Sequence, residues 1–130
     1  MKTAKLIIIL FSLLLLDTYK VYAHGWMAPE SDAKKENPIK INEKSINNGK
    51  KLFENFCSSC HGPEATGIKK EITGLNIDTP NLPARLKTHT DGDFHWKILN
   101  GRNQMPSFKE ELSENEIWHI INYIRVLIKK

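Results

Sequence analysis

Two cysteines and a histidine lie within one short segment, Cys57-Ser58-Ser59-Cys60-His61, and the chain has no other cysteine. Two thiols at this spacing can form a disulfide, half of a zinc site, a dithiol redox centre or the attachment point of a covalent cofactor. The choice among these depends on what the rest of the sequence supplies.

Each alternative makes a different demand. A thioredoxin-like dithiol belongs at the start of a helix among βαβ units, and this sequence has almost no strand pattern. A zinc site needs about four ligands, usually with a second paired motif, and the remaining histidines are not spaced to provide one. They are His24, His89, His95 and His119. A disulfide does not require the adjoining histidine. We therefore interpret the segment as a haem c site, with both thiols joined to the porphyrin and His61 as the proximal iron ligand.

A haem that only transfers electrons needs a second axial ligand, usually Met or His, from a later segment. Met105 in Gln104-Met105-Pro106 is the candidate. Proline disfavours helical angles at the preceding residue, so Met105 is expected on a short, stiff, extended stretch. Methionine is more often a core residue than a ligand. His89, in the loop before the next predicted helix, is the alternative ligand.

Three amphipathic helices are expected to position these groups. The first runs from Ser45, a plausible N-cap, to Cys57 and leads directly into the haem motif. The second begins at Thr90, buries Phe94, Ile98 and Leu99, and stops at Asn100-Gly101. The last begins with the capping box at 113–116 and repeats apolar residues at three- and four-residue steps up to Leu127. Between the first two helices, residues 62–89 are expected to form a long irregular stretch that a haem would hold in place.

The chain resembles the small class I cytochromes c of the bacterial single-haem kind, from about Ser45 to Ile128. Three blocks in the right order carry the resemblance. They are Gly49–Phe53 leading into Cys57–Gly62, Asp91–Ile98 leading to Gly101 and Met105-Pro106, and Leu112-Ser113 through Trp118 to Arg125. The resemblance implies an all-α class I cytochrome c fold of three to five helices wrapped around one covalently bound haem c.

The resemblance also implies roles for residues outside the motif. Gly49 and Phe53 would meet Ile120 and Tyr123 where the first and last helices cross. A second set would line the haem. Pro80 would accept a hydrogen bond from His61 through its carbonyl, Leu82 would pack on the porphyrin, and Trp96 would either approach a propionate or simply fill the core. His95 and His119 are expected to be half-exposed surface histidines.

The first residues have the layout of a secretory signal peptide. Lys2 and Lys5 precede an apolar run of 11 residues from Leu6 to Leu16, and cleavage is expected after Ala23. That run is shorter than the roughly 20 residues that a membrane span needs. We expect a signal peptide at 1–23, an N-terminal extension or docking arm at 24–44, and a cytochrome c domain at 45–130, located in the periplasm without a stable membrane span.

Removal of residues 1–23 leaves 16 basic and 14 acidic residues, since three lysines and one aspartate are lost from totals of 19 and 15. The resulting charge of about +2 lacks the basic stripe typical of nucleic-acid binding. Four basic residues could still surround the exposed haem edge and attract an acidic partner. They are Lys69, Lys70, Arg102 and Lys109.

The extension allows two interpretations. A free amine at His24 beside its imidazole could chelate copper, although no second histidine lies nearby. The favoured interpretation is an extended arm that packs Trp26 and Met27 on the domain or on a partner.

The expected function is electron transfer by one haem between respiratory redox proteins of unknown identity, without enzymatic activity. An alternative is a dedicated haem c subunit of an oxidoreductase complex, docked through the arm. An enzyme or ligand sensor would need an open iron site, which the Met105-Pro106 segment opposes. Because a domain of this size buries a modest core, a chain without haem is expected not to fold.

Overall fold

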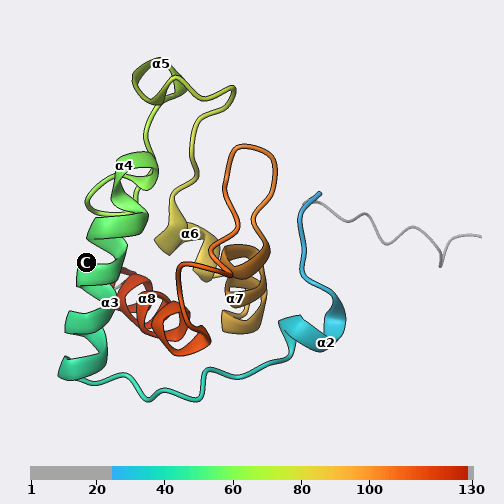
Figure 1. Cartoon of the computed structure of the whole chain (residues 1–130), viewed down its shortest axis with the longest axis vertical. Coiled ribbons are helices and arrows are strands. Elements are labelled where there is room, and N and C mark those ends of the chain that lie inside the picture. The colour runs from blue at the N-terminus through green and yellow to red at the C-terminus, as the bar shows by residue number, and fades with distance from the viewer. Residues whose placement is uncertain (1–24, 129–130) are drawn as a thin grey trace, which may run out of the picture.

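The computed structural model describes residues 25–128, so the predicted signal peptide and His24 lie outside the described residues. The helices in this range are α2 (Glu30–Ala33), α3 (Glu43–Phe56), α4 (Ser58–His61), α5 (Lys70–Thr73), α6 (Leu82–Leu86), α7 (Asp91–Asn100) and α8 (Glu114–Leu127) (Figure 1). Within residues 25–128 there is no strand, and one isolated bridge pairs Arg102 with Met105. The expected all-α architecture is confirmed. The short helices α2, α4, α5 and α6 raise the number of helices above the expected range.

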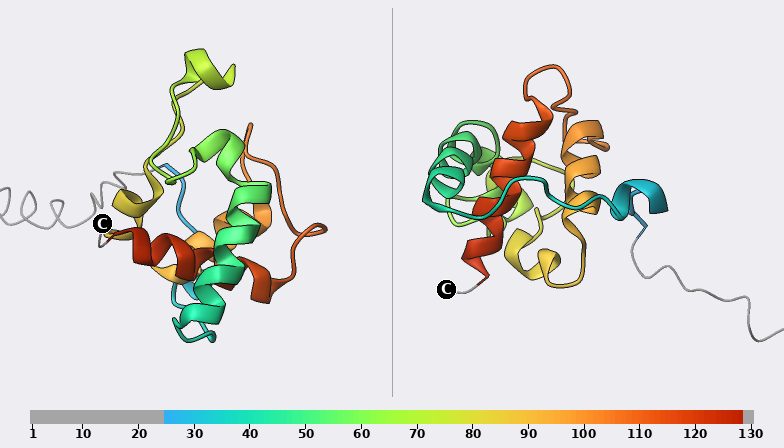
Figure 2. Two further views of the ribbon diagram at one scale, coloured as in Figure 1. Left: turned by 90° about the vertical axis from the view of Figure 1, so that its left-hand side faces the viewer. Right: turned by 90° about the horizontal axis from the view of Figure 1, so that it is seen from below.

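The long helices α3 and α8 cross at close range at the centre of the fold (Figure 2). A Cβ at Gly49 would overlap the carbonyl oxygen of His119 and would lie 2.9 Å from the Cβ of Tyr123. One turn later, the rings of Phe53 and Tyr123 lie 5.5 Å apart. The crossing expected from the resemblance is therefore present, with Gly49 against the α8 backbone itself.

Replacing Gly49 by alanine is expected to lower the free energy of unfolding by about 2 to 3 kcal/mol, because the added methyl group must push the two helices apart. In an open helix position the same change would stabilise by roughly 0.5 to 1 kcal/mol. Denaturant unfolding of the haem-loaded protein measures the difference. Asn47→Ala, on the exposed side of α3, is the control and should shift stability by no more than about 0.5 kcal/mol. A stabilised Gly49→Ala variant would contradict the close crossing.

The start of α3 differs from the expectation. Asn42 is the N-cap, because its side chain accepts a hydrogen bond from the backbone N–H of Ser45 at 2.8 Å. Ser45 lies inside the helix, is buried, and its hydroxyl accepts a bond from Asn122 of α8 at 2.8 Å. The predicted N-cap role of Ser45 is therefore wrong, because a distant residue of α8 engages its hydroxyl.

The starts of α7 and α8 are as predicted. The Thr90 side chain accepts from the N–H of Asp93, and α7 ends at Gly101. Ser113 and Glu116 form the complete capping box at the start of α8. These signals lie within a few residues of the helix ends that they fix, which explains why the sequence reveals them.

His95 is buried, with 2% of its surface exposed, and its ring stacks on that of Trp118 at 4.0 Å. The prediction of a half-exposed surface histidine is wrong at this position, because α2 packs on α7 and covers it. His119 is half-buried, as expected.

The stretch 62–89 is less irregular than expected, because it contains α5 and α6. Asn81 caps α6 by accepting a hydrogen bond from the N–H of Ala84 at 2.9 Å. Helix α5 sits at the tip of a loop that stands away from the crossed helices (Figures 1 and 2). The loop then returns to the body of the molecule at α6.

The described part of the N-terminal arm packs on its own domain. After α2 the chain crosses over α8 to reach the start of α3 (Figure 2). The Asn37 amide donates to the carbonyl of Trp118 at 3.2 Å and to Asn122 at 2.9 Å, and Asn122 donates to the carbonyl of Ile39 at 2.9 Å. Trp26 is half-buried, whereas Met27 is 43% exposed. The division of the chain at residue 44 stays a prediction, and α3 begins two residues before Ser45.

Candidate haem site

Helix α3 continues almost directly into the Cys-X-X-Cys-His segment. Cys57 is both the C-cap of α3 and the N-cap of α4. Its N–H donates to the carbonyl of Phe53 at 2.9 Å, and its carbonyl accepts from the N–H of His61 at 2.9 Å. Helix α4 is a single turn that stops at Gly62, which has a positive φ of 81°. The two cysteines and the histidine are therefore held on one helical turn against the end of the longer helix.

Both thiols are free and half-buried. Burial raises the pKa of the Cys57 thiol to about 12, and the neighbouring Cys60 adds to this shift. Cys57 is therefore a neutral thiol at physiological pH. A dithiol redox centre depends on a lowered thiol pKa, so this geometry disfavours that alternative. Within residues 25–128 no group of three or more His, Cys, Asp or Glu side chains is placed so that it could hold a metal ion.

His61 has the properties of an iron ligand. Its Nδ1 is buried, and no group lies at the distance and angle of a hydrogen bond from it. Burial lowers the pKa of the ring, and hydrogen bonding with the Pro80 backbone opposes part of that shift. The neutral imidazole is the form that binds metals. A neutral imidazole close to a backbone carbonyl, next to two free cysteines, fits covalent haem attachment.

Thr79 fixes the loop after the motif, a role that the sequence patterns do not predict. Its hydroxyl donates to the carbonyl of Cys60 at 2.7 Å and accepts from the N–H of Ile68 at 2.7 Å. Gly67, with φ of 89°, permits this approach, since a Cβ there would overlap the Thr79 carbonyl. The signal in the sequence that points to Thr79 is its position directly before Pro80. These bonds hold the Thr79-Pro80 segment against α4.

Leu82 lies at the start of α6 next to this segment. Its N–H donates to the carbonyl of Ala65 at 2.8 Å, and its half-buried side chain packs against the core. The proposed roles of Pro80 toward His61 and of Leu82 toward a porphyrin stay predictions. The structure brings the Pro80 backbone to the His61 ring, as the first role requires.

Met105 lies in a tight turn between α7 and α8. Arg102 and Met105 exchange two backbone hydrogen bonds, at 2.9 and 3.0 Å. Asn103 has a positive φ of 54°, and a Cβ at Gly101 would lie 2.5 Å from the backbone of Pro106. Met105 is half-buried and packs against the core. The sequence predicts an extended stretch at Met105; in the structure Met105 is a bridge residue at the end of a tight turn whose tip is Asn103-Gln104, and residues 106–108 after it are not helical.

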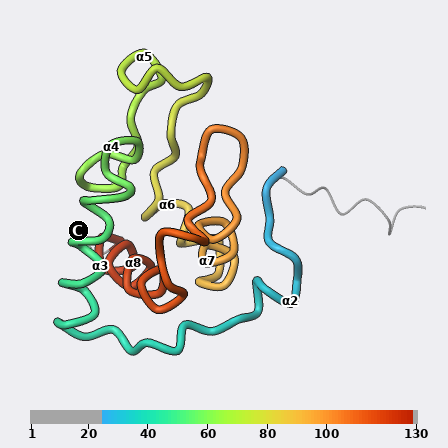
Figure 3. Tube along the Cα trace, in the orientation of Figure 1, coloured from blue at the N-terminus to red at the C-terminus, as the bar shows by residue number. Residues whose placement is uncertain are grey.

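The Met105 turn and the loop before α6 are in contact. The N–H of Asn76 donates to the side-chain oxygen of Gln104 at 2.7 Å. In the view of Figure 3, α4 lies on one side of the segment that descends to α6, and the turn between α7 and α8 lies on the other side. His61 and Met105 therefore come from segments that are distant in the sequence. The 62–81 loop follows His61 directly and contacts the Met105 turn through the bond from Asn76 to Gln104.

The remaining candidate residues belong to α7 and its approach. His89 is buried, its Nδ1 lies 2.9 Å from the carbonyl oxygen of Arg85, and its ring lies edge-on to Phe94 at 6.2 Å. Trp96 is half-buried on α7, and its carbonyl accepts from Asn100 at 2.8 Å. A propionate contact for Trp96 stays a prediction.

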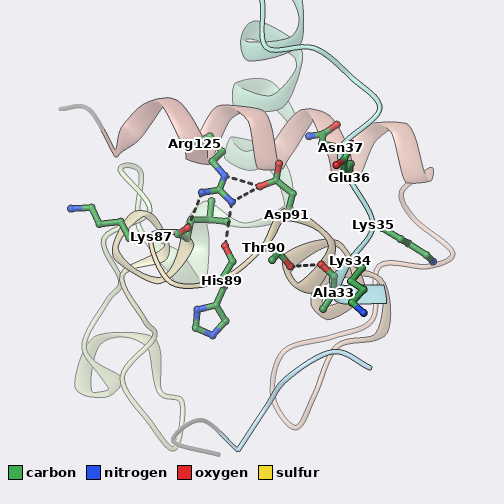
Figure 4. A pocket seen from close by; sticks show the side chains of 11 residues that line it. Ala33, Lys34, Lys35, Glu36, Asn37, Lys87, His89, Thr90, Asp91 and Arg125 are labelled. Atoms are coloured by element: carbon green, nitrogen blue, oxygen red, sulfur yellow. Dashed lines mark hydrogen bonds and ion pairs between the residues drawn. The ribbon is translucent and has the colours of Figure 1, made fainter. Parts of the chain in front are cut away.

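A cleft of about 530 Å³ lies between the end of α2 and the start of α7 (Figure 4). Arg125 crosses it, bonding Asp91 at 2.6 Å and the carbonyls of Leu86 at 2.7 Å and His89 at 3.2 Å. These bonds join α6, α7 and α8, so we assign Arg125 a structural role.

Two of the four basic residues expected at the haem edge have local partners. Lys69 pairs with Asp78 at 2.8 Å, which raises the pKa of the lysine. Arg102 donates to the carbonyl of Gly25 at 2.6 Å. The ion pair offsets the charge of Lys69, so the steering hypothesis is weaker for that residue, whereas the hydrogen bond from Arg102 to a neutral carbonyl leaves the arginine charge in place.

Comparison with known proteins identifies the family. Residues 44–124 match the family described as "Cytochrome C oxidase, cbb3-type, subunit III". The chain belongs to this family of cytochrome c domains. Cytochromes c carry electrons on a covalently held haem, so the predictions of a haem c cofactor and of an electron-transfer protein rather than an enzyme are confirmed.

Curated relatives and solved structures agree with this assignment. Cytochrome c6 of Petalonia fascia is 35% identical over 81 residues, covering 61% of this chain and 88% of the relative. Cytochrome c6 of Alaria esculenta is 30% identical over 86 residues, covering 61% and 87%. The crystal structure of cytochrome cL from Methylophaga aminisulfidivorans aligns with a TM-score of 0.52 at 28% identity, covering 65% of this cytochrome and 54% of the solved chain.

A reducing HAO-like protein complex from Kuenenia stuttgartiensis contains a similar chain, with a TM-score of 0.55 and 26% identity over 70% of this cytochrome and 47% of that chain. This cytochrome thus spans about half the length of the two solved chains. No helix within residues 25–128 is long and apolar enough to cross a membrane.

Proposed function

We propose that this cytochrome c is a periplasmic carrier of single electrons, with one haem bound covalently through Cys57 and Cys60 and ligated by His61 and Met105. The observation that supports it best is the environment of His61. Burial lowers the pKa of the ring and so favours the neutral imidazole, its buried Nδ1 has no hydrogen-bond partner, and the Pro80 backbone lies beside it. The predicted signal peptide supports the periplasmic location.

The chain's own residues hold and adjust the cofactor, which when bound supplies the one-electron chemistry of its iron. Donation from Nδ1 of His61 to the Pro80 carbonyl would fix the tautomer and orientation of the ring and increase its basicity. The thioether of Met105 would favour the reduced state and raise the potential. Half-buried apolar side chains such as Leu82 would exclude water.

Partners would be a redox donor and a redox acceptor. A stable haem subunit of a complex remains the second candidate, because the matching family is described as an oxidase subunit and one solved relative comes from a protein complex. Residues 25–42 also contact α7, α8 and the Met105 turn of their own domain. Co-purification of a partner at high salt would favour the subunit, and a monomer would favour the free carrier.

Carbon monoxide tests whether both axial positions are filled. The reduced wild-type protein is expected to show no spectral change under carbon monoxide, because Met105 closes the iron site. The variant Met105→Ala is expected to bind the gas readily. Met27→Ala, which removes an exposed methionine of the arm, is the control and should behave as wild type. Rapid binding by the wild-type protein would contradict the carrier proposal and favour a ligand sensor or an enzyme.

A further inference from the structure

We propose that the start of the N-terminal arm, residues 25–28, holds the Met105 turn in place, with Trp26 and Arg102 as positioning residues for the axial ligand. The inference rests on the proposed ligation by Met105. It assigns a role within the molecule to a segment that lies outside the matched family region at 44–124.

Arg102 joins the arm to the ligand turn. Its backbone forms both hydrogen bonds with Met105, at 2.9 and 3.0 Å. Its guanidinium donates to the carbonyl of Gly25 at 2.6 Å and lies 5.9 Å from the centre of the Trp26 ring. One residue therefore connects the main chain at Met105 to the first described residues of the arm.

Trp26 lies close to two cations. The ammonium of Lys97 is 5.6 Å from the centre of its ring, and the guanidinium of Arg102 is 5.9 Å away. Such contacts contribute through the attraction of a cation to the aromatic face. Lys97 belongs to α7 and Arg102 to the turn, so the indole ring joins the helix to the turn that follows it.

A buried carboxylate anchors the arm beside Trp26. Asp93 of α7 is 1% exposed and accepts from the N–H of Ala28 at 2.7 Å and from Lys97 at 2.5 Å. Breaking a buried charged hydrogen bond is costly, so the arm is expected to stay attached at this point. Lys97 is held by the same carboxylate and is thereby fixed against Trp26.

Helix α2 fastens the arm to α7 a second time. The hydroxyl of Thr90 donates to the carbonyl of Ala33 at 2.6 Å, and a Cβ at Gly92 would overlap the carbonyl of Asp32. The arm is therefore fixed to α7 at both Asp93 and Thr90. Met105 can leave its position only if the turn at residues 102–105 moves. Arg102 opposes this movement because it binds the turn to the fixed arm.

The test measures how fast Met105 leaves the iron. Saturating imidazole is added to the oxidised, haem-loaded protein, and the rate of the absorption change reports departure of the methionine. Trp26→Ala and Arg102→Gln are expected to react roughly fivefold faster than wild type, the change that corresponds to loss of the contact between Arg102 and Trp26, which both variants remove. Trp26→Phe keeps an aromatic face, so it should react with imidazole at close to the wild-type rate.

Lys34→Ala is the matched control, because Lys34 lies on the same arm and its side chain pairs with Glu30 at 2.6 Å in an exposed ion pair. It should react at the wild-type rate. Equal rates in all variants, in a wild-type protein that shows the methionine–iron band, would overturn the role of the arm and leave the proposed function intact. Absence of that band in the wild-type protein would instead overturn both proposals.

Discussion

Replacing both Cys57 and Cys60 by alanine is expected to abolish folding. The domain is small, and a core of this size supplies a net stability of only about 5 kcal/mol or less without a staple. The loop at 62–81 extends away from the crossed helices (Figure 1), and its bonds to α4 centre on Thr79. Without the cofactor, the segments that carry His61 and Met105 would lose the group that we propose they surround.

Thermal unfolding followed by circular dichroism measures this effect. The double variant should show no cooperative transition, whereas Ser59→Ala, which changes an exposed residue between the two cysteines, should attach haem and melt as wild type does. A haem-free double variant with a cooperative, native-like transition would contradict the expectation, and would mean that the core of α3, α7 and α8 is sufficient for folding.

Replacing Met105 by alanine is expected to lower the reduction potential by on the order of 100 mV or more, since axial ligands alone set haem potentials over about 0.8 V. The thioether favours the reduced iron, and its loss removes that preference. Water or another donor would then reach the oxidised iron.

Spectroelectrochemical titration of the purified protein gives the potential directly. Met27→Ala is the control, because Met27 is 43% exposed and belongs to the arm. It should titrate at the wild-type potential as a one-electron couple. An unchanged potential in Met105→Ala would show that another residue ligates the iron, with His89 the first candidate.

Features set by neighbouring residues could be predicted from the sequence. The caps at Thr90 and Ser113 were identified correctly because each bonds within its own first turn. The Cys57–His61 motif was identified because both thiols and the imidazole lie within five consecutive residues. The close crossing at Gly49 was expected from the family resemblance and is present.

Features that depend on distant segments could not be predicted in this way. Ser45 was assigned as a cap, but its hydroxyl bonds to Asn122, 77 residues away. His95 was expected at the surface, and its burial depends on α2 folding back over α7. Thr79 and Arg102 act through partners in other segments. Local patterns contain no information about which distant segment will cover or bond a side chain.

An absorption spectrum of the purified, exported protein in both oxidation states tests whether His61 and Met105 ligate the iron. We expect low-spin haem and, in the oxidised wild-type protein, the weak red charge-transfer band of methionine sulfur bound to ferric iron, with that band lost in Met105→Ala. A high-spin or bis-histidine spectrum without the band in the wild-type protein would contradict this ligation. Met105 would then be a core residue, and the iron would be either open or ligated by His89.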